Sequence, residues 1–269
     1  FLAGSADKQV AAEEAERIFG LLEYFAGYGF NKSHSAAYAL ITYQTAFLKA
    51  HYPVEFLCAL MTADKDKTEK VVRIIAEGRA WGVETLPPSI NASLTDFTVV
   101  YGDPEAKAQR PKKTGRRGRG RVRDPYEPRI RFGLGAVRGV GESALEAVLE
   151  ARAEQPFSDL FDLAERVDPK RVNKGVLEAL VASGAFDEVH EQKGISRARA
   201  LAAIDRALER SRSASKDRER GQTSLFGLFD QATEAGRASL REGEFPDAEP
   251  WDLRETLVRE REALGFYVS

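Results

Sequence analysis

The feature that most constrains this sequence is a glycine-punctuated segment near its middle. The segment runs Leu134-Gly135-Ala136-Val137-Arg138-Gly139-Val140-Gly141 and is followed by Ser143-Ala144-Leu145. Two glycines separated by one residue let the backbone turn tightly, and the Ala/Leu spacing after them predicts a helix. A short apolar stretch, Gly-Val-Gly and a helix together are typical of a helix-hairpin-helix.

This hairpin is a candidate DNA-binding site. The N–H groups at the start of the following helix have no acceptor within the helix, and the helix dipole lies behind them. Such groups suit a DNA phosphate and do not read base identity. The alternative, a plain turn between helices with glycine caps, stays open on the pattern alone. The candidate residues are Arg138, Gly139, Val140, Gly141 and Ser143.

A weaker copy of the pattern follows at Arg171-Val172-Asn173-Lys174-Gly175-Val176-Leu177. Here Asn173, Lys174 and Gly175 occupy the turn, so they are also candidate DNA-binding residues. Two such units pack as one compact helical module. We therefore expect the second unit to serve mainly as scaffolding.

The composition limits the class of protein. Hydrophobic residues make up 43% and charged residues 30% of the 269 residues, which is typical of a soluble globular protein. No apolar run approaches the roughly 18 residues that span a bilayer. With Cys58 as the one cysteine and three histidines, a disulfide scaffold and a zinc site of ordinary spacing are excluded. We expect a reducing, cytoplasmic location and no membrane partner.

The net charge of −2 hides an uneven distribution. Residues 104–129 contain ten basic and three acidic residues, a local +7, which leaves −9 for the remainder. The glycine-rich arginine run inside this segment is too polar to bury anything, so we expect a disordered loop. Flanking segments at 97–100 and 130–132 predict the two strands of a small hairpin.

A second candidate site lies in the helical first part of the chain, at Gly27-Tyr28-Gly29-Phe30 and the residues after it. A cation, a hydroxyl and an imidazole fall where a helix begins, which attracts anions such as a triphosphate or a nucleic-acid backbone. The simpler alternative, in which Ser33 caps the helix and His34 satisfies a neighbouring carbonyl, is favoured by the spacing alone. The candidate residues for binding a nucleotide or phosphate are Asn31, Lys32, Ser33 and His34.

A third feature is a short apolar peptide in a polar region, Gln222-Thr223-Ser224-Leu225-Phe226. A glutamine with a Leu-Phe anchor can dock in a partner's pocket or fold back on the protein's own surface. No catalytic constellation appears in the sequence: we find no Asp-x-Asp pair beside a strand, no Ser-His-Asp set and no phosphate-cradling loop ending in Gly-Lys.

Three stretches of the chain carry a family resemblance. Residues 27–34 and 43–53 closely resemble the fingers of the alpha subunits of bacterial DNA polymerase III, the replicative C-family polymerases. The segments 132–142 and 181–187 continue the resemblance, and 264–269 is similar to the approach to that family's OB-fold. The resemblance implies a mainly α fold and a piece of a longer polymerase, with Phe1 as an internal residue.

The resemblance also implies an organisation. Residues 1–86 would be part of the fingers, 87–132 a connecting β-hairpin holding the insert 104–129, and 133–210 a tandem helix-hairpin-helix module. Residues 211–252 would form a flexible tail and 253–269 a helix leading to an OB-fold. The basic insert is longer than the family pattern leads us to expect, so its role is not covered.

The activity implied is that of a DNA-directed DNA polymerase, to which this segment contributes contacts with primed duplex DNA and the incoming deoxynucleoside triphosphate. The catalytic aspartates and their Mg²⁺ ions would lie in a palm upstream of Phe1, so the segment alone would be inactive. The peptide 222–226 is similar to the one that binds the sliding clamp, and other replicase subunits are implied partners. Alternatives are an error-prone C-family paralogue and a stand-alone helix-hairpin-helix module.

Overall fold

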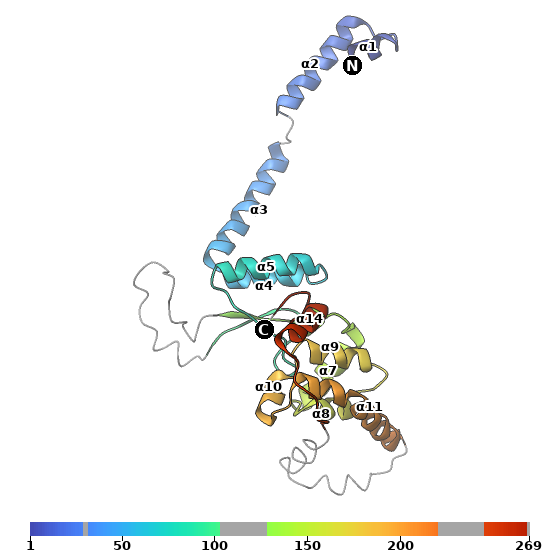
Figure 1. Ribbon diagram of the computed structural model, residues 1–269. Helices are drawn as coiled ribbons and strands as arrows, with labels where there is room; N and C mark the ends of the chain where they lie inside the picture. Colours follow the sequence, from blue (N-terminus) through green and yellow to red (C-terminus); the bar gives the residue numbers. More distant parts are fainter. Residues whose placement is uncertain (29–31, 103–127, 220–244, 268–269) are drawn as a thin grey trace, which may run out of the picture. The chain divides into compact units, whose positions relative to one another are not determined.

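The computed structural model describes residues 1–28, 32–102, 128–219 and 245–267. They form two units, Phe1–Pro53 and Val54–Ser269, which are treated separately. Both are built mainly from helices, as the sequence predicted (Figure 1). No helix in the described ranges is long and apolar enough to cross a membrane.

The first unit consists of helices with little core. It contains α1 (Leu2–Ala6), α2 (Ala12–Tyr28) and α3 (Lys32–His51). Among its described residues, Ala15 is the one buried hydrophobic side chain, while aromatic residues such as Tyr24 stay largely exposed. The apolar periodicity seen in the sequence therefore makes helices here, but these helices bury almost nothing within the unit.

The second unit begins with a helical hairpin packed on a small sheet. Helices α4 (Pro53–Ala63) and α5 (Thr68–Ala80) lie side by side (Figure 1) and share a core with Ile130 and Phe132. The expected fingers segment 1–86 is thus divided, because its last two helices belong to this core.

The sheet has the strand order β1-β3-β2. Strand β2 (Thr98–Val100) pairs antiparallel with β3 (Arg129–Arg131), which confirms the predicted pairing of strands. Strand β1 (Thr85–Leu86) pairs parallel with β3 and was not predicted, because two residues before a double proline carry no strand pattern. Residues 103–127, most of the basic insert, lie outside the described residues.

A helical module with its own core follows the sheet. The module consists of η1 (Leu134–Ala136), α7 (Glu142–Glu154), α8 (Leu160–Arg166), α9 (Lys174–Ala182), α10 (Asp187–His190), η2 (Glu191–Lys193) and α11 (Arg197–Glu219). Helix α11 packs on α8 and α9. Large side chains such as Phe161, Leu177 and Phe186 are almost fully buried between them.

Part of the expected flexible tail 211–252 is ordered. Helix α11 continues to Glu219, because residues 211–219 are mostly good helix formers and contain no glycine or proline. A helix that has already started propagates without needing an apolar stripe. Further along, Phe245 is buried, with its ring centre 4.9 Å from that of Phe161 in an edge-on contact. Residues 220–244 lie outside the described residues.

Helix α14 (Leu253–Leu264) completes the second unit. The Asp252 side chain caps it by accepting a hydrogen bond from the Glu255 N–H at 2.7 Å. Its last residues are buried in the same core as the sheet, and Phe266 packs against Phe132 with ring centres 5.5 Å apart. The C-terminal end of α14 therefore closes over the sheet.

We expect His190 to make the stability of the second unit depend on pH. Burial lowers its pKa to about 4; the nearby Asp159 carboxylate opposes this change and Lys193 adds to it. The unfolded chain, with an ordinary pKa of 6.5, binds the proton more readily between these values. Stability is therefore fully present above pH 6.5 and falls by about 3 kcal/mol as the pH drops toward 4.

Urea denaturation followed by circular dichroism between pH 7 and pH 4.5 would measure this loss. The His190→Gln variant is the control, because glutamine does not titrate but retains an acceptor for the Leu160 N–H that His190 Nε2 accepts at 3.3 Å. The variant is expected to lose less stability over this interval. Equal losses in the two proteins would rule out His190 as the cause.

Candidate nucleic-acid interface

The predicted hairpin lies between η1 and α7 at the surface of the second unit. Its first half is a single 3₁₀ turn, Leu134–Ala136, and its second half is the full helix α7. Arg138, Gly139 and Gly141 are exposed, whereas Val137 is buried in the core of the sheet and α14. The buried valine anchors the turn, and the exposed residues around it face solvent.

The two glycines of the hairpin have different roles. Gly139 adopts φ +88°, a left-handed conformation that residues with a Cβ rarely take, and a Cβ there would lie 3.5 Å from Ala179 Cβ. Gly141 has an extended φ of −76°, and no atom lies within 4 Å of where its Cβ would stand. Only Gly139 is therefore required by the backbone; a side chain at 141 would project into open space.

That open space lies at the N-terminus of α7. Gly141 is the N-cap residue and has no side chain to accept the first-turn N–H groups. The Gly141 carbonyl already accepts the Leu145 N–H, at 3.0 Å. The amides of the first turn point out of the helix without an intrahelical acceptor, so an anion can approach them. Glu142, the first helical residue, places a negative charge beside the same amides.

The side chains around the hairpin differ in how they are engaged. No side-chain hydrogen bond or ion pair of Arg138 is found within the described residues. Ser143 is occupied, because Arg171 Nε lies 3.0 Å from its carbonyl oxygen and 3.1 Å from its Oγ. Arg171 also pairs with Glu146 and Glu150 on α7. Of the predicted side chains in the first hairpin, Arg138 is thus the cation available to a phosphate.

The polar groups of the second turn, although exposed, contact other residues of the protein. The Asn173 Oδ1 accepts the Val176 N–H at 3.1 Å and caps α9. The Lys174 Nζ lies 2.7 Å from Asp205 of α11, and this hydrogen bond raises the lysine pKa. Asn173 thus caps α9 and Lys174 joins α9 to α11, while the role of this unit as scaffolding stays a prediction.

The other predicted site residues fall in different places. Lys32, Ser33 and His34 form the first turn of α3 in the first unit, with the His34 and Tyr38 rings 4.3 Å apart. Asn31 and the peptide Gln222–Phe226 lie outside the described residues. The structure therefore brings together the residues of the first hairpin but does not test the other two sites.

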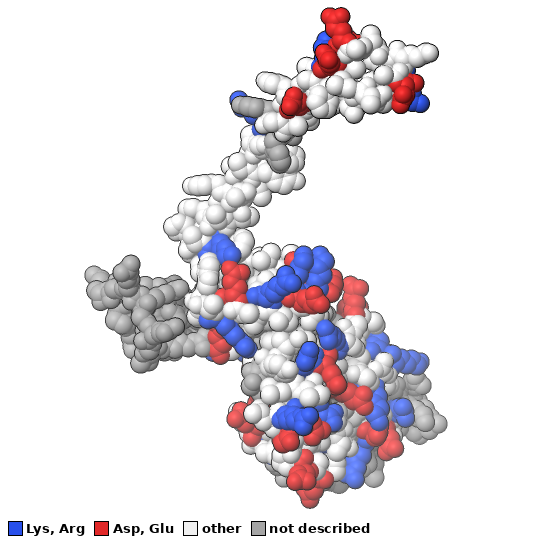
Figure 2. Space-filling model, turned by 45° about the horizontal axis from the view of Figure 1, so that its top comes forward, with Lys and Arg blue, Asp and Glu red and all other residues white. Residues whose placement is uncertain are grey.

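Charge is mixed over the second unit. Figure 2 shows lysine and arginine interspersed with aspartate and glutamate over its visible face, without a continuous basic stripe. Among the described residues, no group of three or more His, Cys, Asp or Glu side chains could hold a metal ion.

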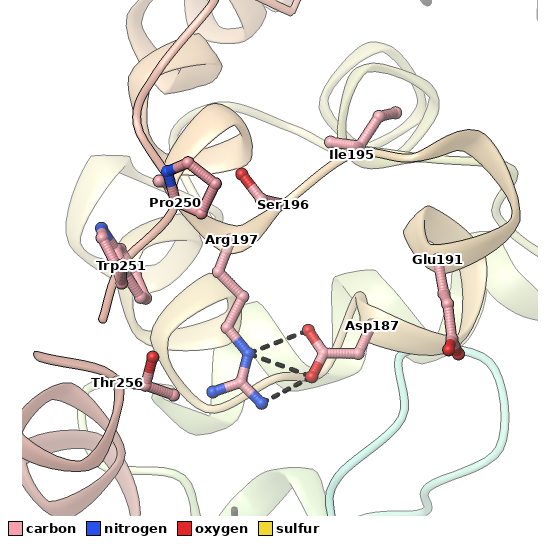
Figure 3. A pocket seen from close by; sticks show the side chains of 9 residues that line it. Asp187, Glu191, Ile195, Ser196, Arg197, Pro250, Trp251 and Thr256 are labelled. Carbon is pink, nitrogen blue, oxygen red and sulfur yellow. Dashed lines mark hydrogen bonds and ion pairs between the residues drawn. The ribbon is translucent and has the colours of Figure 1, made fainter. Parts of the chain in front are cut away.

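A pocket of about 430 Å³ lies between the start of α11 and the residues before α14 (Figure 3). Arg197 crosses it and contacts Asp187 through three hydrogen bonds of 2.5 to 3.0 Å. Its other nitrogen, Nη1, lies 2.8 Å from the buried Glu260 of α14. The guanidinium is therefore fully used in joining α10, α11 and α14. No spacing in the sequence pointed to this cluster.

Two comparisons with known proteins agree with these observations. A sequence model of the helix-hairpin-helix motif matches residues 82–199, which contain both turns. The chain is 41% identical over its whole length to DNA polymerase III subunit alpha of Escherichia coli K12 and to the same subunit of Vibrio cholerae, and covers 20% of each. The subunit of Thermus aquaticus is also 41% identical, with 19% of its length covered.

The chain thus spans about a fifth of the length of these relatives. The match extends from the exposed helices of the first unit to α14, so it is not confined to the hairpin module. The chain belongs to the family of bacterial DNA polymerase III alpha subunits, as a segment that includes a helix-hairpin-helix region.

Proposed function

We propose that this chain is a segment of a DNA-directed DNA polymerase that binds primed duplex DNA. The contacts would be made with the phosphates of the DNA backbone. The observation that carries the proposal is the open N-terminus of α7 at Gly141, beside the exposed Arg138, inside a region that matches the helix-hairpin-helix motif. The match to alpha subunits over the whole chain favours a polymerase segment over a stand-alone binding module.

The proposed contact is independent of DNA sequence. Backbone amides and one guanidinium bind phosphate oxygens but do not reach base edges, as a replicative enzyme requires. Glu142 repels a phosphate at the same helix end, so one hairpin holds the duplex only weakly. We therefore expect several phosphate contacts to act together and the affinity to fall steeply with salt.

The proposal also covers the first unit and the peptide 222–226. Lys32, with Ser33 and His34 beside it, would orient or neutralise the triphosphate of the incoming nucleotide, since phosphoryl transfer depends mainly on positioning and charge stabilisation. The start of α3, with no acidic residue in its first turn, supports an anion there. The peptide would bind the sliding clamp, and other replicase subunits would join the same assembly.

For the duplex contact, we expect Gly141→Asp to weaken binding of the duplex while leaving the fold intact. Aspartate is a favoured N-cap residue, the site has open space, and its carboxylate would occupy the amides and repel phosphate. Gly141→Ser is the matched control, because it caps the helix without adding a charge, so it should bind more weakly than the wild type but better than Gly141→Asp. Fluorescence anisotropy with a primed duplex, together with thermal melting, measures both properties. Unchanged affinity in Gly141→Asp would overturn the proposal.

For the nucleotide contact, we expect Lys32→Ala in the intact polymerase to raise the KM for deoxynucleoside triphosphates about tenfold or more, as loss of a charged contact typically does. Affinity for the primed duplex should not change. Lys49→Ala, in the last turn of the same helix, serves as the control for removing a lysine from α3. Normal nucleotide incorporation by Lys32→Ala would remove this residue from the site.

For the clamp contact, the chain offers its own control, because Leu225-Phe226 is followed by a second such pair, Leu228-Phe229. Alanine substitution of the first pair should prevent co-elution with the sliding clamp, since these side chains would be the apolar anchors. The same substitution of the second pair should preserve co-elution. Equal behaviour of the two variants would show that residues 222–226 are not the specific clamp peptide.

A further inference from the structure

The DNA-binding hairpin is attached to an element far along the chain. The Arg138 N–H donates a hydrogen bond of 2.8 Å to the carbonyl of Ala263, in the last turn of α14. The next residue but one, Gly265, ends the helix with φ +86°. The end of α14 therefore contacts the residue that carries the hairpin's available cation.

Gly265 fits this contact closely. A Cβ at this position would lie 2.0 Å from Thr68 Cγ2 and 3.3 Å from Arg138 Nη2. The glycine is therefore enclosed between the start of α5 and the arginine side chain. Any larger residue would displace one of these two neighbours.

The hairpin is also held by apolar packing: Val137 is buried in the core of the sheet and α14, and Val140 packs against the same core. Its internal backbone bond joins the Val140 N–H to the Val137 carbonyl at 3.2 Å, and the one side chain within 4 Å of a Cβ built at Gly139 is Ala179 of α9. The Arg138 guanidinium lies at the C-terminal end of α14, where helix carbonyls concentrate partial negative charge and favour a nearby cation. The Arg138 backbone is thus held by a hydrogen bond to α14, and its guanidinium lies beside the residue that ends this helix.

We propose that the C-terminal end of α14, Ala263 to Gly265, is a positioning element that sets the backbone and guanidinium of Arg138 for a DNA phosphate. Gly265 is the positioning residue, because its lack of a side chain permits the close contact. This inference rests on the proposed duplex binding by the hairpin. It predicts that duplex affinity depends on a residue that does not itself touch DNA.

The test compares Gly265→Ala with Gly194→Ala in the full 269-residue chain. Both glycines have positive φ, so both substitutions introduce similar backbone strain. At position 194, however, no atom lies within 4 Å of where the added Cβ would stand. Gly265→Ala is expected to raise the Kd for a primed duplex about fivefold, which corresponds to the loss of one hydrogen bond. The slope of log affinity against log salt concentration should become shallower by about one. Gly194→Ala should leave both unchanged.

A second substitution separates positioning from general destabilisation. Thr68→Ser removes the Cγ2 methyl that a Cβ at position 265 would meet, so adding it to Gly265→Ala should restore most of the duplex affinity. The backbone strain at φ +86° remains in the double variant. Failure of the rescue, or equal weakening in Gly194→Ala, would overturn the proposal.

Amide hydrogen exchange of the unmodified chain tests the contact between Arg138 and α14 even if Gly265→Ala does not fold. The Arg138 amide should exchange as slowly as amides in the last turn of α14, because they open together. Exchange as fast as at the exposed Gly141 would overturn the proposal. Gly141→Asp in the same binding assay distinguishes failure of the positioning role from failure of duplex binding. If Gly141→Asp binds the duplex more weakly and Gly265→Ala binds it normally, only the positioning role fails. If Gly141→Asp also binds normally, the duplex-binding proposal itself fails.

Discussion

The burial of Phe132 is the packing constraint on which the rest of the second unit depends. Its ring centre lies 4.7 Å from that of Phe97 in an edge-on contact and 5.5 Å from that of Phe266, and only 1% of the residue is exposed. These contacts join the end of β3 to the segment before β2 and to the end of α14. Because the hairpin begins directly after Phe132, the same anchor determines where Val137 to Gly141 emerge at the surface. Buried aromatic side chains of this size contribute strongly to the stability of a protein core.

Charged groups in this unit mainly hold elements together. Glu260 is buried, where an unpaired carboxylate would be strongly unfavourable, and its contact with Arg197 stabilises the position of α14. Burial tends to lower the pKa of Arg197, but its hydrogen bonds with Asp187 and Glu260 outweigh this and raise it. Arg171 and Lys174 also form ion pairs between elements or turns, but their acidic partners are exposed, so these pairs contribute little to stability. Arg171 and Lys174 thus have acidic partners within the described residues, whereas none is found there for Arg138.

The first unit presents the opposite situation. Its helices α2 and α3 carry exposed aromatic and aliphatic residues, although helices in proteins gain most of their stability by packing an apolar face against other elements. Figure 2 shows a largely uncharged surface along α3. The helical periodicity therefore predicts these helices correctly, but the described residues of 1–53 do not bury their apolar side chains.

The amino-acid sequence alone determined the local features: the helices around Ile75, Leu145 and Leu177, the short strands around Val99 and Ile130, and the tight turn at Gly139. These follow from residue spacing and backbone conformation, which involve near neighbours. Only the tertiary structure decided that Lys174 pairs with Asp205, that Phe245 is buried, and that the end of α14 holds Arg138. Such contacts join residues distant in sequence, and their formation depends on how whole elements pack, which no local pattern encodes.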